Sequence, residues 1–234
     1  MRRDQEHALE VRLAVAAVGA VVLLVPFAVI AAMVVGDVDW LHAVDQDVSV
    51  SVHDVALGHP ALVDFMAAWC LVFDPWVWRL GALALVIWLV RRGSRPLAWW
   101  VAITMAAGGL LGVLLKLLFE RHRPSFLDPV AMAAGYSFPS GHALNNALGA
   151  AVFLMVLLPM TRHRPRLRLA LLVAGIGIPF VTGVFRVGLG VHWVSDVLGG
   201  WIFGLAVVAA TTTAFLARRR RRRRREALTD AMAR

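Results

Sequence analysis

The sequence is poor in cysteine, in lysine and in charge, and each shortage excludes a class of protein. Cys70 is the single cysteine among 234 residues, so no disulfide can form within the chain. Charged residues make up 17% and hydrophobic residues 60%, against about 45–50% apolar residues in soluble domains. A water-soluble single domain is therefore excluded. The formal net charge is +9, and Lys116 is the one lysine among 24 basic residues.

The sequence contains long apolar stretches without charged residues. Five stretches carry no charged residue and approach the ~20 residues that are needed to cross a membrane. They are Leu13–Val35, Leu97–Leu115, Ala143–Met160, Leu169–Phe185 and Val197–Ala217. The first is too long for the apolar core of a signal peptide and has no clear cleavage site, so we expect a retained helix. The sequence predicts an all-α, polytopic membrane protein.

A sixth span is expected within Pro60–Val90, which contains three charged residues and two prolines. Asp74 and Pro75 indicate a helix start, because aspartate caps helices and proline favours the first helical position. We predict a span over Pro75–Val90 and a separate short helix over Pro60–Phe73, at the membrane surface or packed on the bundle. One long helix kinked at Pro75 is the alternative.

The arginines set the expected topology. Eighteen of them flank the spans in four groups: Arg2, Arg3 and Arg12; Arg91, Arg92 and Arg95; Arg162, Arg164, Arg166 and Arg168; and Arg218–Arg225. With six spans all four groups lie on one side, which the positive-inside rule assigns to the cytoplasm. Gly36–Asp74, expected on the other side, has seven carboxylates and no lysine or arginine. Both termini are therefore expected in the cytoplasm of a multi-pass cell-membrane protein.

This topology divides the chain into a cytoplasmic segment 1–12, a six-span region 13–217 and an arginine-rich cytoplasmic tail 218–234. The run Arg218–Arg225 is expected to stop the last span at the headgroups and to attract anionic lipid. Nucleic-acid binding through this run would rest on electrostatics alone, and nothing else in the sequence supports it, so no nucleic-acid partner is expected.

The remaining polar residues gather in three short segments, which the six-span topology places at the opposite, extracytoplasmic membrane surface. These segments are 116–124, 137–142 and 186–196. Ionisable groups at or within an apolar region are costly, so their clustering indicates a functional site. The catalytic core is accordingly expected within 116–196.

The first segment offers two cations. Lys116 and Arg123 are seven residues apart, which predicts that both project from one face of a helix that ends near Pro124. Two cations on one face suit a bound anion. The plainer interpretation pairs Lys116 with Glu120 in an i,i+4 salt bridge.

The second segment, Pro139-Ser140-Gly141-His142, directly precedes a span. Ser140 supplies a capping hydroxyl, Gly141 permits close approach to the backbone, and the free N–H groups of a helix start favour an anion. His142 would be a titratable group at the rim of this anion site. An ordinary helix cap is the alternative.

The third segment contains Arg186 and, further along, a histidine and an aspartate four residues apart, His192 and Asp196. If this stretch is helical, both lie on one face, and a carboxylate bound to one ring nitrogen leaves the other nitrogen's lone pair outward. That arrangement suits a nucleophilic histidine. The alternatives are a buried structural pair, or a metal site that His122 or His142 would have to complete and that lacks a convincing third ligand.

Together the segments supply three fixed cations, a helix N-terminus, two histidines and an orienting carboxylate, which indicate metal-independent phosphoryl transfer to histidine. Three motifs stand in order: Lys116-x6-Arg123-Pro124, Pro139-Ser140-Gly141-His142 and Arg186-x5-His192-x3-Asp196. They resemble the three signature motifs of the type 2 phosphatidic acid phosphatase family, which shares its site with the vanadium haloperoxidases. The chain departs from the family at one position, because Phe185 stands where a serine usually precedes the arginine.

The resemblance implies a role for each matched residue. His192, held by Asp196, would attack phosphorus and form a phosphohistidine. His142 would protonate the leaving oxygen and then activate the water that releases phosphate. The phosphoryl oxygens would be held by Lys116, Arg123, Ser140, the N–H group of Gly141, and Arg186. No metal and no other cofactor is expected.

The expected function is hydrolysis of lipid phosphate monoesters or diphosphates at the outer membrane surface. Candidate substrates are phosphatidate, phosphatidylglycerol phosphate and polyprenyl diphosphates such as undecaprenyl diphosphate; membrane lipids are the other expected partners. One alternative is a vanadate-dependent oxidoreductase of the haloperoxidase type, whose relatives are soluble. Another is a non-catalytic lipid-binding membrane protein. Halide oxidation with added vanadate, or phosphate release by the purified protein, distinguishes the three.

Overall fold

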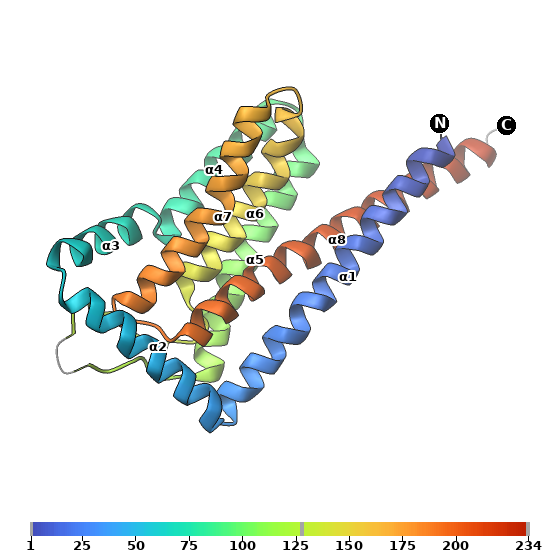
Figure 1. The fold of residues 1–234 in the computed structure, drawn as a ribbon. Helices are drawn as coiled ribbons and strands as arrows, with labels where there is room; N and C mark the ends of the chain where they lie inside the picture. The colour runs from blue at the N-terminus through green and yellow to red at the C-terminus, as the bar shows by residue number, and fades with distance from the viewer. Residues whose placement is uncertain (1, 127–128, 233–234) are drawn as a thin grey trace.

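A computed structural model describes residues 2–126 and 129–232, which fold into helices joined by short turns and one long loop (Figure 1). The helices are α1 (Arg2–Val35), α2 (Asp39–Leu57), α3 (Pro60–Val72), α4 (Pro75–Arg91), α5 (Arg95–Phe119), α6 (Gly141–Leu157), α7 (Pro165–Gly188) and α8 (Val194–Met232), with a 3₁₀ turn over Leu158–Thr161. These two ranges contain no strand, which confirms the all-α prediction.

Six helical stretches of the described chain are long and apolar enough to cross a membrane, as predicted. The second of them, Pro60–Arg91, combines α3 and α4, yet these are separate helices. The carboxylate of Asp74 accepts the backbone N–H of Trp76 at 2.8 Å, and Pro75 takes the first position of α4. The prediction of two helices is confirmed and the single kinked helix is wrong, since α3 turns away from the direction of α4 (Figure 1).

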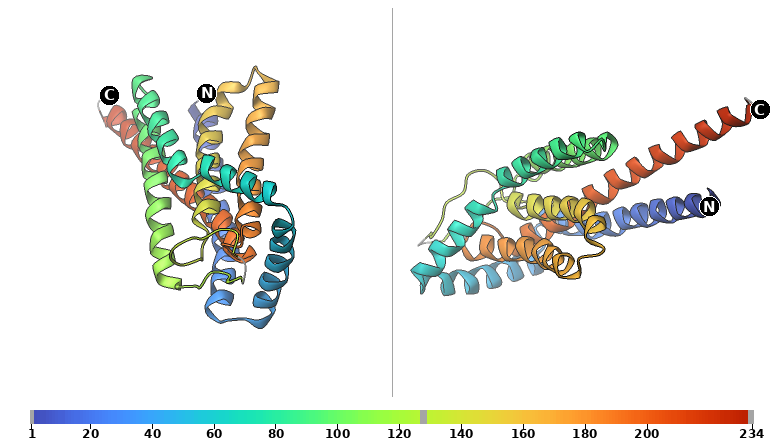
Figure 2. Two further views of the ribbon diagram at one scale, coloured as in Figure 1. Left: turned by 90° about the vertical axis from the view of Figure 1, so that its left-hand side faces the viewer. Right: turned by 90° about the horizontal axis from the view of Figure 1, so that it is seen from above.

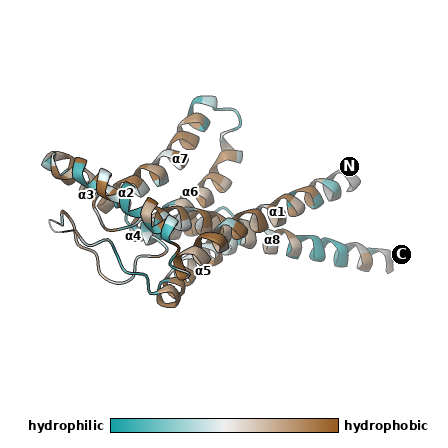
Figure 3. Ribbon diagram, turned by 60° about the horizontal axis from the view of Figure 1, so that its bottom comes forward, coloured by the Kyte–Doolittle hydropathy of each residue, from teal (hydrophilic) through white to brown (hydrophobic). Residues whose placement is uncertain are grey.

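The bundle has two chemically different ends. Both ends of the described chain and the α4–α5 and α6–α7 turns point one way, whereas α2, α3 and the long loop after α5 lie at the other end (Figures 1 and 2). The four arginine groups therefore share one end. The α6–α7 turn and the last turns of α8 are hydrophilic, whereas the preceding parts of these helices are mostly hydrophobic (Figure 3). The last helix does not stop at Arg218 but continues to Met232, because arginine is a good helix former.

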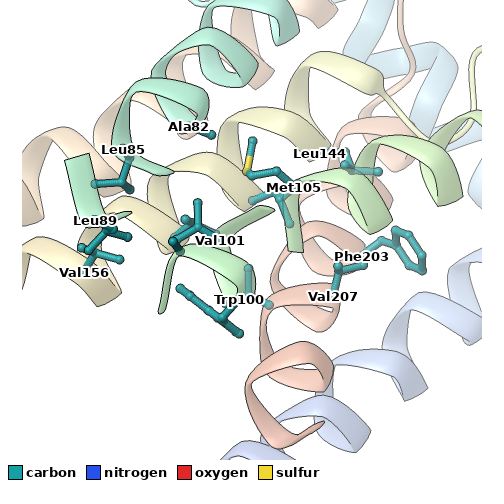
Figure 4. Close-up of a cluster of buried hydrophobic side chains, with 14 of the residues drawn as sticks. Ala82, Leu85, Leu89, Trp100, Val101, Met105, Leu144, Val156, Phe203 and Val207 are labelled. Carbon is teal, nitrogen blue, oxygen red and sulfur yellow. The ribbon is translucent and has the colours of Figure 1, made fainter. Parts of the chain in front are cut away.

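Helix α6 is the centre of the bundle and packs against α4, α5, α7 and α8. The apolar side chains between these helices form the main core (Figure 4), which includes Ala82, Leu85, Leu89, Trp100, Val101, Met105, Leu144, Val156, Phe203 and Val207. Two glycines let α8 approach α6 closely. A Cβ on Gly200 would lie 2.8 Å from the carbonyl oxygen of Ser140, and one on Gly204 would lie 2.7 Å from that of Leu144. These glycines hold together the N-terminal ends of α6 and α8, where the polar segments meet.

Candidate active site

The three polar segments converge where α5 ends and where α6 and α8 begin. The backbone N–H of Ser140 donates to the carbonyl oxygen of Asp196 at 2.9 Å, which joins the second segment to the third. The ammonium of Lys116 donates to the carbonyl oxygen of Tyr136 at 2.5 Å, and the guanidinium of Arg123 donates to the same oxygen at 3.2 Å. Residues up to 80 positions apart are thus gathered at one end of the bundle.

His192 and Asp196 form the expected pair, although not on one helix face. Helix α8 begins at Val194, so His192 lies in the loop before it. Its Nδ1 lies 3.2 Å from Oδ2 of Asp196, and the same oxygen accepts the backbone N–H of Trp193 at 2.9 Å. Both side chains are buried, with 2% and 0% of their surface exposed. The carboxylate acts as a helix cap and orients the imidazole at the same time.

The second ring nitrogen of His192 faces a cation. Its Nε2 lies 3.1 Å from Nη1 of Arg123, which can only donate, and Nδ1 faces the carboxylate of Asp196. These partners favour the neutral tautomer with the proton on Nδ1. Burial, followed by the positive charges of Arg186, Arg123 and Lys116, lowers the pKa of His192 well below its usual range. The imidazole therefore keeps a lone pair on Nε2 at neutral pH, as a nucleophile requires.

Lys116 and Arg123 reach the same place by a route that differs from the predicted one. Helix α5 ends at Phe119 because Glu120 adopts the left-handed conformation, with φ of 46°, and Arg123 follows in a segment without regular secondary structure. The prediction that both cations share one helix face is wrong. The alternative salt bridge from Lys116 to Glu120 is absent from the described part of the chain, where the ammonium binds backbone carbonyl oxygens instead.

Ser140 caps α6 as predicted, and its hydroxyl accepts the backbone N–H of Ala143 at 3.5 Å. Gly141 begins the helix beneath the side chain of Lys116, since a Cβ at this glycine would lie 3.8 Å from Cε of the lysine. The free N–H groups of the helix start therefore lie beside a fixed cation. Such a combination favours a phosphate or another anion.

His142 faces a carboxylate that was predicted only as a cap. Oδ1 of Asp74 accepts the N–H of Trp76, whereas Oδ2 lies 3.5 Å from Nε2 of His142. The amide of Asn146 donates to the carbonyl oxygens of Phe73 and His142, at 2.8 and 2.9 Å, which fixes the α3–α4 break against α6. The break between the two helices thus brings an acidic group to the histidine.

Arg186 contributes the third cation from α7. Its Nε is buried and has no hydrogen-bond partner within the residues that the structure describes. Phe185, which replaces the usual serine, packs edge-on against Phe65 and Trp69 of α3, with ring centroids 5.8 and 6.0 Å apart. The substitution exchanges a hydroxyl for an aromatic contact between α7 and α3.

A network that the sequence analysis missed supports this cluster from behind. Arg121 donates from Nη1 to Oδ1 of Asp196 and from Nη2 to Oδ2 of Asp45, each at 2.7 Å. Asp45 also accepts the backbone N–H and the hydroxyl of Ser195, at 2.9 and 2.5 Å. Asp45 therefore fixes Arg121, and Arg121 in turn fixes the carboxylate of Asp196 beside His192.

Helix α2 carries this carboxylate, and the sequence analysis assigned no helix to that segment. Its polar residues Asp45, Ser49 and His53 recur every four positions and are all buried. This spacing, within a segment expected outside the membrane, is the pattern that would have predicted a helix with a polar face turned to the protein.

Asp45→Asn is expected to lower kcat roughly 10–100-fold with little change in KM, the range typical of residues that orient a functional histidine's partners. The amide keeps the volume of the side chain but removes one of the two carboxylates that neutralise Arg121. Asp47→Asn is the matched control, because this exposed residue lies on the same helix. An equal loss in both variants, or an unchanged kcat in Asp45→Asn, would contradict a positioning role.

Among the described residues, no three histidine, cysteine or carboxylate side chains are grouped as a metal ion would need, so His122 completes no such cluster there. The site instead concentrates fixed cations around one buried imidazole.

A family model described as the PAP2 superfamily matches residues 97–220. Phosphatidylglycerophosphatase B of Bacillus subtilis (strain 168) is 40% identical over 100 residues, which cover 41% of this chain and 47% of that protein. An undecaprenyl-diphosphatase of Sulfolobus acidocaldarius is 29% identical over 121 residues, or 50% of this chain and 54% of that protein. The chain thus spans about half the length of the curated relatives it matches.

The fold agrees over a longer stretch. The crystal structure of a transmembrane PAP2-type phosphatidylglycerolphosphate phosphatase from Bacillus subtilis superposes with a TM-score of 0.66 at 26% sequence identity. The superposition covers 82% of this chain and 93% of that chain.

Proposed function

The chain belongs to the PAP2 superfamily, and from this membership we propose that it is an integral membrane phosphatase that hydrolyses lipid phosphates through a phosphohistidine. One observation carries the proposal: a buried, neutral His192 is held by Asp196 and faces Arg123 within a group of three cations. Nucleophile, orienting carboxylate and charge for the phosphoryl oxygens lie together at one end of α5, α6, α7 and α8.

The proposed reaction has two steps. Nε2 of His192 attacks phosphorus, the bond from phosphorus to the leaving oxygen breaks, and His142 gives that oxygen a proton. His142 then takes a proton from water, whose oxygen attacks the phosphohistidine, and the phosphorus–nitrogen bond breaks to release phosphate. Lys116, Arg123, Arg186, Ser140 and the N–H of Gly141 hold the phosphoryl oxygens, whose charge grows in the transition state. Arg123 already lies 3.1 Å from Nε2, so an oxygen bound to it brings phosphorus to the nucleophile.

The substrate class follows from where the site lies. The cluster stands at the ends of α5, α6 and α8, so a phosphate head can enter it while an acyl or prenyl chain stays in hydrocarbon. Phosphatidylglycerol phosphate, phosphatidate and polyprenyl diphosphates all have this form. The names of the relatives include a phosphatidylglycerophosphatase and an undecaprenyl-diphosphatase, which support this choice.

Phosphate release by the purified full-length protein in detergent micelles tests the proposal. We expect hydrolysis of at least one of these lipids, full activity in EDTA, and inhibition by vanadate, which resembles the five-coordinate phosphoryl transition state. Loss of activity on chelation and recovery with Zn²⁺ or Mg²⁺ would contradict the metal-independent mechanism. Release of no phosphate from any lipid would favour a non-catalytic protein, and vanadate-dependent halide oxidation would favour the haloperoxidase alternative.

We also propose that both termini are cytoplasmic and that the site faces outward. The arginine groups at one end of the bundle, opposite the polar cluster, support this orientation (Figure 1). In a Cys70→Ser background, single cysteines at Gln46 and Ser125 are expected to react with an impermeant thiol reagent in intact cells. One at Ser94 is expected to react only after permeabilisation. Labelling of Ser94→Cys in intact cells would contradict this orientation and indicate the opposite one.

The same orientation places the run Arg218–Arg225 at the cytoplasmic surface, where we propose that it attracts anionic headgroups, at about 1 kcal/mol for each basic residue.

A further inference from the structure

A groove separates the first turns of α5 from α8 at the level of the arginine run. Its volume is about 570 Å³, within the ~300–1,000 Å³ that small-molecule sites occupy. It lies at the arginine-rich end of the bundle, far along α5 and α8 from the polar cluster that contains His192. The groove therefore belongs to no part of the candidate active site.

The walls of the groove are apolar and its mouth is basic. Trp99, Ile103 and Phe215 line the walls, and the first two expose 69% and 50% of their surface. Three arginines stand on the adjoining turns of α8: Arg218, Arg219 and Arg222. Their spacing places them on one helix face, continuous with the apolar wall. A charged mouth above an apolar trough fits an amphiphile with a negatively charged head.

A largely buried tryptophan of α5 adds to the apolar lining of the groove. Trp100 is 4% exposed and lines the groove, and its ring centroid lies 6.5 Å from that of Phe215. The indole ring thus extends the apolar lining of the groove, against which an acyl chain can pack.

The arginine run has a second face that provides a comparison. Arg220, Arg223 and Arg224 line a much smaller cavity against α1, and Arg220 pairs with Glu10. On the groove side, Arg222 pairs with Glu226 of the same helix, whereas Arg218 and Arg219 have no carboxylate partner within the described side chains. The charge left for an external anion is therefore on the groove side.

We propose that this groove binds one anionic phospholipid. Its phosphate lies against Arg218 and Arg219, and one acyl chain lies along Ile103 and Phe215. This site narrows the proposed attraction of the arginine run to a single place and does not depend on the phosphatase chemistry.

Native mass spectrometry of the full-length protein in detergent, titrated with phosphatidylglycerol, tests the proposal. Replacing the groove arginines (R218Q, R219Q and R222Q together) is expected to weaken binding about a hundredfold, from the contribution of each surface arginine. The triple variant R220Q, R223Q and R224Q removes the same charge from the other face and is expected to stay within about threefold of wild type. Phosphatidylcholine is expected to bind the wild-type protein no more tightly than phosphatidylglycerol binds the groove variant.

A second variant separates the groove from charge alone. Ala214→Trp fills the groove while it keeps every arginine, and we expect it to lose phosphatidylglycerol as the first triple variant does. Unchanged thermal unfolding of the lipid-free variants confirms that they fold. Equal losses of binding in the two triple variants, or full binding in Ala214→Trp, would contradict a lipid site in the groove. Only a general electrostatic attraction between the arginine run and anionic lipid would then remain. If glycerol 3-phosphate at equal concentration displaced phosphatidylglycerol, the groove would be a site for a soluble phosphate. That result would contradict the proposal of a phospholipid site.

Discussion

His192→Ala is expected to abolish hydrolysis of every lipid phosphate and to leave no phosphorylated protein. The imidazole is the group that forms the covalent intermediate, and loss of a nucleophile costs about 10⁴-fold or more in rate. Neighbouring groups cannot replace it, because the other lone pairs that face Arg123 belong to backbone carbonyl oxygens, such as that of Val191, and an amide oxygen is a poor nucleophile. Rates with the lipid substrate, and acid-quenched protein after radioactive substrate, measure the two losses.

Two controls keep this result interpretable. His192→Gln retains a polar side chain that can still bind Asp196, and it is expected to be as inactive as His192→Ala while it folds normally. His163→Ala removes an exposed histidine at the opposite end of the bundle and is expected to keep full activity. Hydrolysis by His192→Gln at more than about a hundredth of the wild-type rate would exclude the nucleophilic role.

His142→Ala is expected to trap the phosphorylated protein while it slows turnover. A general acid contributes about 10²–10⁴-fold, and most of that loss should appear with lipid substrates, whose leaving oxygen needs a proton. An activated aryl phosphate should recover part of the rate of the first step. The second step should stay slow, because the same histidine activates water, so label from a radioactive aryl phosphate should remain on the protein.

The neighbour of His142 gives an intermediate case. Asp74→Asn keeps the cap on Trp76 but removes the charge 3.5 Å from the ring, so we expect a smaller loss than in His142→Ala and the same recovery with the aryl substrate. Label that persists in His192→Ala and vanishes in His142→Ala would show that the two histidines have the opposite roles.

The sequence by itself determined the membrane-spanning fold. Six candidate spans, the break at Asp74 and the cap at Ser140 are all found in the structure, although the second candidate span, Pro60–Arg91, includes α3 as well as the predicted Pro75–Val90. The physical reason is that hydropathy, capping and proline effects act over a few neighbouring residues, so a local stretch of sequence contains them. The clustering of the three polar segments followed in turn from the topology, since spans of similar length return the chain to the same surface.

Only the tertiary structure decided how the site is held. Arg123 meets Lys116 through a loop because one left-handed residue, Glu120, ends α5 early, and periodicity does not reveal such an ending. Asp45 binds Arg121, which is 76 residues away in the sequence, and Asp74, at the break between α3 and α4, lies beside His142 of α6. Those contacts depend on how α2 and α3 pack on the end of the bundle. Because packing between distant segments has no local sequence period, the residues of the site could be predicted while the partners that orient them could not.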